Sequence, residues 1–354
     1  MKKIALALLL CFFCACCFGA CMEIETVVKD GGGSSGGDAI GVIGDSTDGE
    51  VEEKPDGAQN ADDISDIIYS AFGYIEFGFY PQTIAEKDAV EQMSATTDST
   101  GYYVSAYDNE HYARVAPADV YALFETGYEF TDETEIQARG TYYFKVEPIK
   151  WRVFAQLDLT GNMKNIYLVS DLILDSSAFL SDKNYALDPT TDEYRNLTNG
   201  SLANNWAYSE LRTYLNDDFY KRAFSSLSDE DKAKIIERDV SEVCDDYDQE
   251  NSKEKVFVLS YEQAQNLTTL NSVVSDYARC RGTWMSIYPE LYGNGRWWLS
   301  TAGDRTYRSC YVSDHSSISR AGESAGSTFM GIRPSIMLNV SDAFEILTDE
   351  EEQK

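Results

Sequence analysis

The closing stretch "GNGRWWLSTAGDRTYRSCYVSDHSSISRAGESAGSTFMGIRPSIMLNV", Gly293 to Val340, decides how the chain completes its fold. It combines a tryptophan pair, closely spaced glycines, many hydroxyl side chains and an arginine-proline step before an apolar run. Short apolar runs bounded by glycine and serine are typical of short strands. We therefore expect the chain to close with strands at "RWWLS", "CYVSD" and "RPSIMLNV".

The residues before this stretch alternate between strand and helix patterns. Three segments have the apolar periodicity of strands: "YIEFGFYP" at 74–81, "IKWRVFAQL" at 149–157 and "NIYLVSDLIL" at 165–174. The segment "SELRTYLNDDFYKRAF" at 209–224 spaces its apolar residues as one face of a helix does. Ser228 and Ser260 each stand before a further helical segment, where a hydroxyl can cap the first turn.

These elements predict an α+β fold. We expect a single globular domain over 71–345, built from short mixed or antiparallel strands and a few helices, because this length supports one large core. The segment 85–141 is polar, rich in tyrosine and poorly periodic, which indicates an insertion in that domain. An acidic tail follows at 346–354.

The first twenty residues have the pattern of an export signal. Lys2 and Lys3 precede a short apolar run, too short for a membrane span. The run ends in "FGAC", which resembles the lipobox of bacterial lipoproteins, with Phe18 where that motif usually has leucine. The resemblance implies that Cys21 is diacylated and becomes the new N-terminus. We therefore expect an exported protein that is lipid-anchored to the bacterial cell membrane, with its folded part outside the cytoplasm.

Residues 21–70 have the composition of a tether. Glycine, serine and acidic residues dominate "GGGSSGGDAIGVIGDSTDGEVEEKPDGAQNADD", so this segment cannot bury enough apolar surface to fold. A flexible chain of about 45 residues has an end-to-end distance of roughly 40 Å.

The net charge of −31 limits the partners of the chain. A surface this acidic repels nucleic acid, and it favours solubility outside the cell. Divalent-cation binding is the alternative, with Asp245, Asp246 and Asp248 as candidate ligands, although "CDDYDQEN" lacks the register of a calcium loop. We predict no cofactor.

The cysteines allow at most one internal disulfide. Removal of the leader leaves Cys244, Cys280 and Cys310 besides the lipidated Cys21. Export favours oxidation, and Cys280–Cys310 is the candidate pair. The chain has only two histidines, which does not favour a structural zinc site.

The closing stretch also offers a candidate ligand-binding surface. Neighbouring residues of a strand point to opposite faces, so we expect one indole of the tryptophan pair in the core and the other half-exposed. Loop residues on a sheet are common binding groups. The candidate ligand-binding residues are Trp298, Arg305, Tyr307, Arg308, Tyr311 and His315. The alternative is that both tryptophans and Arg333 only complete the core.

Catalytic patterns are weak. A Ser-His-Asp hydrolase would need His111 or His315 as its base, and no G-x-S-x-G motif is present. A glycosidase needs two carboxylates about 5–9.5 Å apart, which a sequence cannot show. We therefore favour a protein without catalytic activity.

The order of the motifs resembles a bacterial family catalogued as domain of unknown function 6273. The resemblance rests on "IEFGFYPQ", "IKWRVF", "LVSDLILD", "SELRTYLNDDFYKRAF", "KVFVLSYEQA", "SDYARCRG", "RWWLSTAG" and "GIRPSIMLN", and covers nearly the whole globular part. Members often carry Arg-Ser-Pro where this chain has Ser300–Thr301–Ala302, and 85–141 exceeds their usual compact start. The ending is similar to C-type-lectin-like domains of the formylglycine-generating-enzyme type. Without the cysteine pair of that enzyme, this implies a fold and not its oxidase activity.

Together these observations predict a binding ectodomain for glycan or protein ligands on a surface lipoprotein. The alternatives are a hydrolase acting on envelope polysaccharide and a structural envelope component without catalytic activity.

Overall fold

The computed structural model describes residues 74–118, 128–156, 165–181, 191, 202–240, 253–267 and 270–339. All of them belong to one compact unit, Ala58–Lys354. Within these ranges no helix is both long and apolar enough to cross a membrane. Several predicted features lie outside the described residues: the export signal, Cys21, the tether, Cys244, the cluster of Asp245, Asp246 and Asp248, and the acidic tail.

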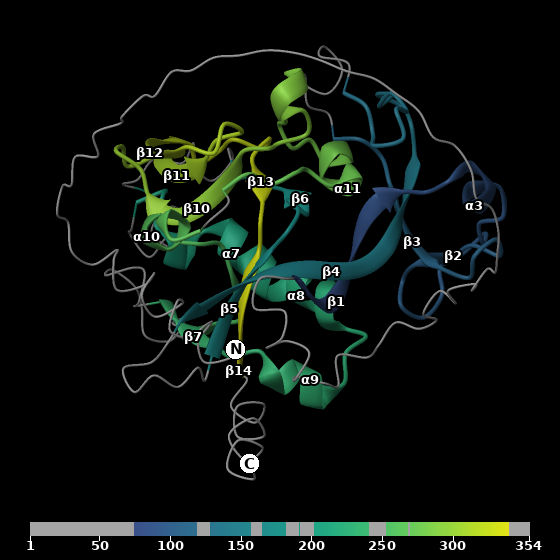
Figure 1. The fold of residues 1–354 in the computed structure, drawn as a ribbon, viewed down its shortest axis with the longest axis horizontal. Coiled ribbons are helices and arrows are strands. Elements are labelled where there is room, and N and C mark those ends of the chain that lie inside the picture. Colours follow the sequence, from purple (N-terminus) through teal and green to yellow (C-terminus); the bar gives the residue numbers. More distant parts are fainter. Residues whose placement is uncertain are drawn as a thin grey trace, which may run out of the picture. The chain divides into compact units, whose positions relative to one another are not determined.

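The larger sheet is antiparallel and runs through the middle of the domain (Figure 1). Its strand order is β2-β3-β4-β5-β14-β9, and β1 pairs with β4. The strands are β1 (Tyr74–Ile84), β2 (Tyr103–Val104), β3 (His111–Val115), β4 (Tyr142–Gln156), β5 (Asn165–Ser170), β9 (Val256–Phe257) and β14 (Ser335–Asn339). The three early strands and the closing strand expected from the sequence are therefore present, and β4 begins seven residues before the predicted segment.

The smaller sheet contains most of the closing stretch. Its order is β12-β11-β10-β13-β6, antiparallel except for the pair of β10 and β13. The strands are β6 (Asp175–Ser176), β10 (Trp297–Ala302), β11 (Arg308–Val312), β12 (Ile318–Ser324) and β13 (Gly331–Ile332). A two-stranded ribbon, β7 (Arg238–Asp239) with β8 (Lys253–Glu254), stands apart from both sheets.

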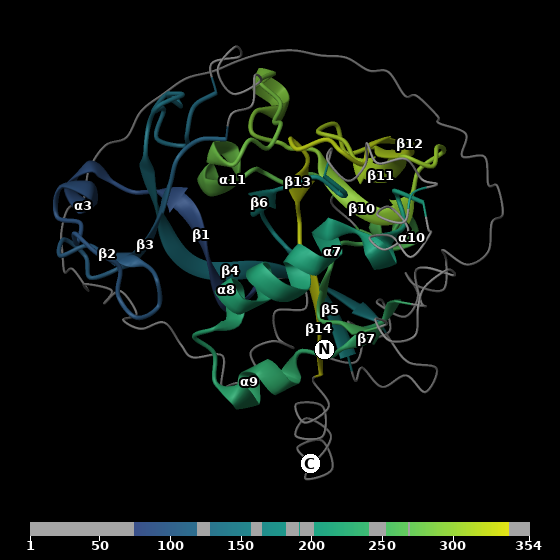
Figure 2. The same ribbon diagram turned by 180° about the vertical axis from the view of Figure 1, so that it is seen from behind.

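One continuous helical run follows the predicted amphipathic segment. It consists of α7 (Glu210–Tyr214), a π-helical turn η2 (Leu215–Phe219) and α8 (Tyr220–Phe224). The run lies across one face of β1 and β4, as Figures 1 and 2 show from opposite sides. Its apolar residues pack on β1, where the Tyr80 and Phe219 rings lie 4.8 Å apart. Gly78 permits this packing, because its φ is 72° and a Cβ there would lie 2.7 Å from the Ala223 carbonyl oxygen.

The other helices are short, and serines cap several of them. Ser228 accepts the Asp231 amide, and Ser260 forms a capping box with Gln263, so both predicted caps are confirmed. These helices are α3 (Lys87–Glu91), η1 (Trp206–Tyr208), α9 (Asp229–Lys234), α10 (Tyr261–Gln265), α11 (Asp276–Cys280) and η5 (Pro289–Leu291).

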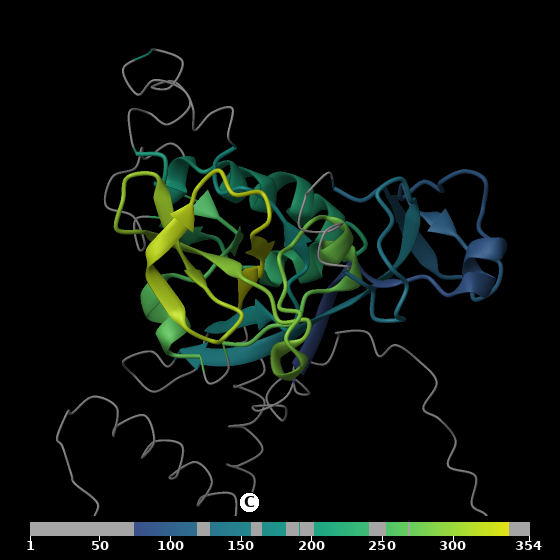
Figure 3. The ribbon, with the colours of Figure 1, turned by 90° about the horizontal axis from the view of Figure 1, so that it is seen from above.

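The segment 85–141 contributes both a projecting part and core residues. α3, β2 and β3 extend from the side of the domain (Figure 3) around a small cluster of Ala85, Ala89 and Tyr112. In contrast, Tyr128 and Phe130 pack into the main core. The predicted α+β class, with mixed and antiparallel strands in a single globular domain, is confirmed.

Candidate ligand-binding pocket

The tryptophan pair belongs wholly to the core. Trp297 and Trp298 are both 0% exposed, and the Trp298 indole donates to the Ser177 carbonyl at 2.9 Å. The expectation of a half-exposed indole is wrong because β10 is an interior strand whose two faces are both covered, with Phe179 packed 5.8 Å from Trp298. Trp298 cannot therefore contact a ligand.

The other predicted ligand-binding residues do not form one site. Arg305, Tyr307 and Arg308 lie together at the turn between β10 and β11, where Tyr307 is 39% exposed. His315 is exposed in the turn at the opposite end of β11, with its Nδ1 3.0 Å from Asp314 Oδ2. Tyr311 lies between these turns and is half-buried.

The predicted Cys280–Cys310 disulfide is wrong, since both thiols are free. Cys280 lies on α11 and Cys310 on β11, each buried among the side chains around its own element. Burial raises the pKa of Cys280 to about 12 and that of Cys310 to about 11. Neither thiol is therefore ionised near neutral pH, and we assign neither a chemical role.

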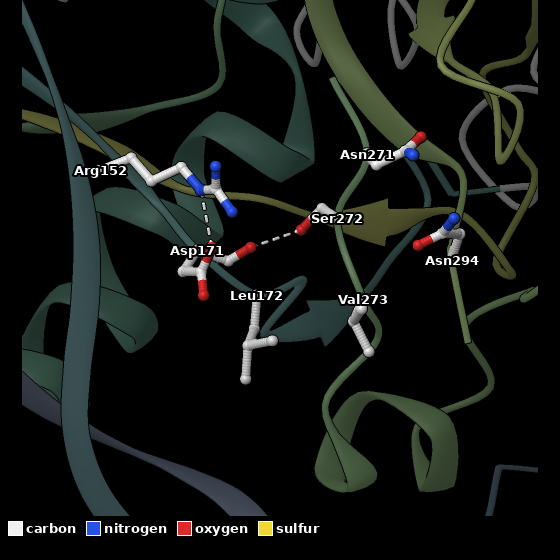
Figure 4. A pocket seen from close by; sticks show the side chains of 7 residues that line it. All are labelled: Arg152, Asp171, Leu172, Asn271, Ser272, Val273 and Asn294. Carbon is white, nitrogen blue, oxygen red and sulfur yellow. Dashed lines mark hydrogen bonds and ion pairs between the residues drawn. The ribbon is translucent and has the colours of Figure 1, made fainter. Parts of the chain in front are cut away.

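A pocket opens beside Arg152 of β4, where three further segments of the chain meet (Figure 4). Backbone bridges hold these segments side by side, because Ile173 donates to Val273 O at 2.9 Å and Val274 donates to Gly293 O at 2.8 Å. The pocket encloses about 180 Å³ and is lined by Arg152, Asp171, Leu172, Asn271, Ser272, Val273 and Asn294.

An ion pair forms one side of the pocket. Arg152 Nε donates to Asp171 Oδ1 at 2.7 Å, and Ser272 Oγ donates to the Asp171 carbonyl at 2.8 Å (Figure 4). Both charged side chains are partly exposed, so solvent screens their attraction, and the pair fixes positions more than it stabilises the fold.

Two asparagines form the opposite side. Asn294 is only 9% exposed, yet its carboxamide makes no hydrogen bond with any described residue. Asn271 accepts a hydrogen bond from Ser316 Oγ through its Oδ1, while its amide nitrogen has no partner in the described part of the chain. Both amides line the pocket with hydrogen-bonding atoms that the described residues leave unused, so they can bind a polar ligand.

Exposed apolar side chains occur in the pocket lining and on the loop before Asn294. Val273 lines it, and Ile287, Tyr288 and Tyr292 stand on the loop that leads to Asn294, with Tyr288 58% exposed. Two backbone bonds close this loop, from Ser286 N to Asn294 O at 2.8 Å and from Gly293 N to Ser286 O at 3.1 Å. The two tyrosines are thus part of a closed loop that ends at Asn294.

A buried carboxylate, Asp175, lies in the core and not in this pocket. Asp175 is 1% exposed and accepts four hydrogen bonds. Two come from the Tyr80 and Tyr214 hydroxyls, at 2.7 and 2.5 Å. The others come from the Ser176 backbone amide at 2.7 Å and from Arg281 Nε at 3.0 Å. Burial first, and the Asp175 charge second, raise the pKa of Tyr80 and of Tyr214 well above that of a free tyrosine. Both phenols are therefore donors at neutral pH, and the cluster is fully bonded.

A second buried carboxylate, Glu254, also accepts several hydrogen bonds from the protein. It accepts from Arg212 Nε at 2.9 Å, Arg238 Nε at 2.7 Å and Trp206 Nε1 at 2.9 Å. These bonds join β7 and β8 to η1 and α7, which is a structural role. The described residues also contain no group of three histidine, cysteine, aspartate or glutamate side chains placed to hold a metal ion.

Fold and pocket together define an α+β domain with an open pocket whose lining residues come from separate segments of the chain. A family model described as a domain of unknown function, DUF6273, matches residues 172–340. The match begins at Leu172 and includes five of the seven pocket residues, whereas the earlier motifs of the expected resemblance precede it. Comparisons with curated proteins and with solved structures gave no match.

Asn271 and Asn294 were not predicted from the sequence. Asn294 lies in "GNG", a pattern that predicts a turn because asparagine and glycine are both common in turns. Asn294 and Asn271 line the same pocket only in the folded chain. A local sequence pattern cannot show whether an amide has a hydrogen-bond partner.

Proposed function

We propose that this protein is a surface lipoprotein whose ectodomain binds a glycan in the pocket between Arg152 and Asn294. The observation that carries the proposal is the Asn294 carboxamide, which lines the pocket and makes no hydrogen bond with any described residue. A ligand with hydroxyl or amide groups would supply the missing hydrogen bonds.

The pocket's side chains suit a sugar. Amide, carboxylate, guanidinium and hydroxyl groups can together donate to and accept from the hydroxyls of one ring. The volume of about 180 Å³ lies below the roughly 300–1,000 Å³ of pockets that enclose a drug-sized molecule. Only one small unit of the ligand enters, and the remainder lies on the rim.

The rim supports the same ligand class. Tyr288 and Tyr292 are exposed on the loop that leads to Asn294, and an exposed aromatic ring can stack on the apolar face of a sugar. A fixed turn holds these rings, which lowers the conformational entropy lost on binding.

Binding is favoured over hydrolysis by the pocket's charges. Asp171 is the one carboxylate among the residues that line the pocket, and it is paired with Arg152. A glycosidase requires two carboxylates, one of them free to exchange a proton.

The location of this ectodomain rests on the N-terminal sequence. The basic start, the apolar run and "FGAC" support export and acylation of Cys21, followed by the acidic tether. A C-type-lectin-like arrangement, suggested by the closing strands, is part of the proposal and is consistent with glycan binding.

A glycan array probed with the purified protein tests the proposal. We expect hits that the Asn294→Leu variant loses, because leucine has a similar shape but cannot hydrogen-bond. Asn266→Leu is the matched control, since Asn266 is exposed at the end of α10 and is not part of the pocket lining. Hits that survive Asn294→Leu, or an array without hits, would reject glycan binding in this pocket.

A further inference from the structure

We infer that the pocket selects an acetamido group, so that the glycan carries an N-acetylated amino sugar. This inference rests on the proposed function and narrows its ligand class. It comes from the two asparagines, which present amide groups to one small space (Figure 4).

The donors and acceptors match. An acetamido group has one N–H donor and one carbonyl acceptor, fixed on opposite sides of a planar unit. The Asn271 oxygen is occupied by Ser316, so Asn271 offers the N–H that an acetamido carbonyl needs. Asn294 uses neither of its polar atoms on the described residues, so its oxygen can accept the acetamido N–H.

The apolar lining matches the remaining atoms. Leu172 and Val273 are the two apolar residues of the pocket, and they supply contact for the acetamido methyl.

The same arrangement disfavours related sugars. A hydroxyl in place of the acetamido group does not reach both asparagines and has no methyl. An ammonium group has three donors and no acceptor, so the Asn271 N–H would stay unpaired. Sites built to hydrogen-bond a ligand group reject analogues that lack it, because the buried partners are left without bonds.

Isothermal titration with three sugars tests the inference: the methyl glycosides of N-acetylglucosamine, glucose and glucosamine. We expect N-acetylglucosamine to bind at least about tenfold more tightly than the other two, from the cost of an unpaired polar group. Asn294→Leu should abolish this preference. Asn271→Asp should do the same, because aspartate keeps the acceptor for Ser316 and removes the donor. Asn266→Leu should retain the wild-type affinities.

The outcomes separate the inference from the proposed function. Equal affinity for N-acetylglucosamine and glucose, both lost in Asn294→Leu, would retain glycan binding and overturn the acetamido preference. Array hits confined to sugars without an acetamido group would do the same. Binding of N-acetylalanine methylamide as tight as that of N-acetylglucosamine would show recognition of an amide without the sugar, and would also overturn the inference. An array with no hits, together with no measurable binding in the three titrations, would reject both the acetamido preference and glycan binding.

Discussion

Two buried polar regions of this domain differ in how completely their groups are bonded. Asp175 accepts four hydrogen bonds, from two tyrosines, a backbone amide and an arginine. Asn294 is also largely buried, yet its carboxamide has no partner in the described part of the chain. The difference teaches that burial of a polar residue does not by itself indicate function. A fully bonded group holds the fold, and an unbonded group that lines a pocket indicates a ligand.

Removal of the Asp175 carboxylate should have the largest effect on stability. Asp175→Ala leaves Arg281 without its carboxylate, the Ser176 amide without this acceptor, and the Tyr80 and Tyr214 hydroxyls with only each other as partners in this cluster. We expect a loss of about 3–5 kcal/mol in the free energy of unfolding. Urea denaturation measures it. Asp217→Ala is the control, because Asp217 is exposed and paired only with exposed Lys221, and should change stability little. Equal effects of the two changes would remove the distinction between bonded and unbonded regions.

Removal of the two tyrosine hydroxyls should have smaller, coupled effects. Tyr80→Phe and Tyr214→Phe each delete a hydrogen bond to a charged acceptor, for about 1.5–3 kcal/mol. The hydroxyls share Asp175 Oδ2 and lie 3.0 Å apart, so the double variant should deviate from the sum by at least about 0.5 kcal/mol. Strict additivity in a double-mutant cycle would show that the two do not act as one cluster.

The same tyrosines should make the fold sensitive to alkaline pH. Their pKa is raised in the folded state, so the proton they keep stabilises the native protein below pH 10 and this stabilisation is lost as pH rises above it. Each group contributes at most about 1.4 kcal/mol per pH unit in that window. Urea midpoints at pH 9, 10 and 11 measure the decline, which should be shallower in Tyr80→Phe. If the urea midpoint of Tyr80→Phe fell with pH as steeply as that of the wild-type protein, the pKa of Tyr80 would not be raised in the folded state.

Replacement of Asn294 should have the smallest effect on stability, although it abolishes binding. Asn294→Leu removes no hydrogen bond to a described residue, so the free energy of unfolding should change by less than about 0.5 kcal/mol or rise. Thermal denaturation of the ligand-free protein measures it. A loss of several kcal/mol would mean that this amide belongs to the structure, as Asp175 does.

The sequence predicted the local elements better than the binding site. Alternating aromatics specified β1, and Ser228 and Ser260 specified helix starts, because periodicity and capping are local properties. The exposure of Trp298 depended on what covers β10, and the Cys280–Cys310 pairing depended on where α11 and β11 lie. Those are tertiary relations. The pocket joins Arg152, Asn271 and Asn294, which are far apart in the chain, so no local pattern could assemble it.

The most direct test of the account observes the asparagine amides themselves. Selective ¹⁵N-asparagine labelling gives side-chain NH₂ signals, which variants at positions 271 and 294 assign, and N-acetylglucosamine glycoside is then titrated in. The account predicts that the Asn294 and Asn271 carboxamide signals shift together and saturably, while that of Asn266 does not move. Saturable binding that leaves both carboxamide signals unchanged would contradict the pocket as the binding site.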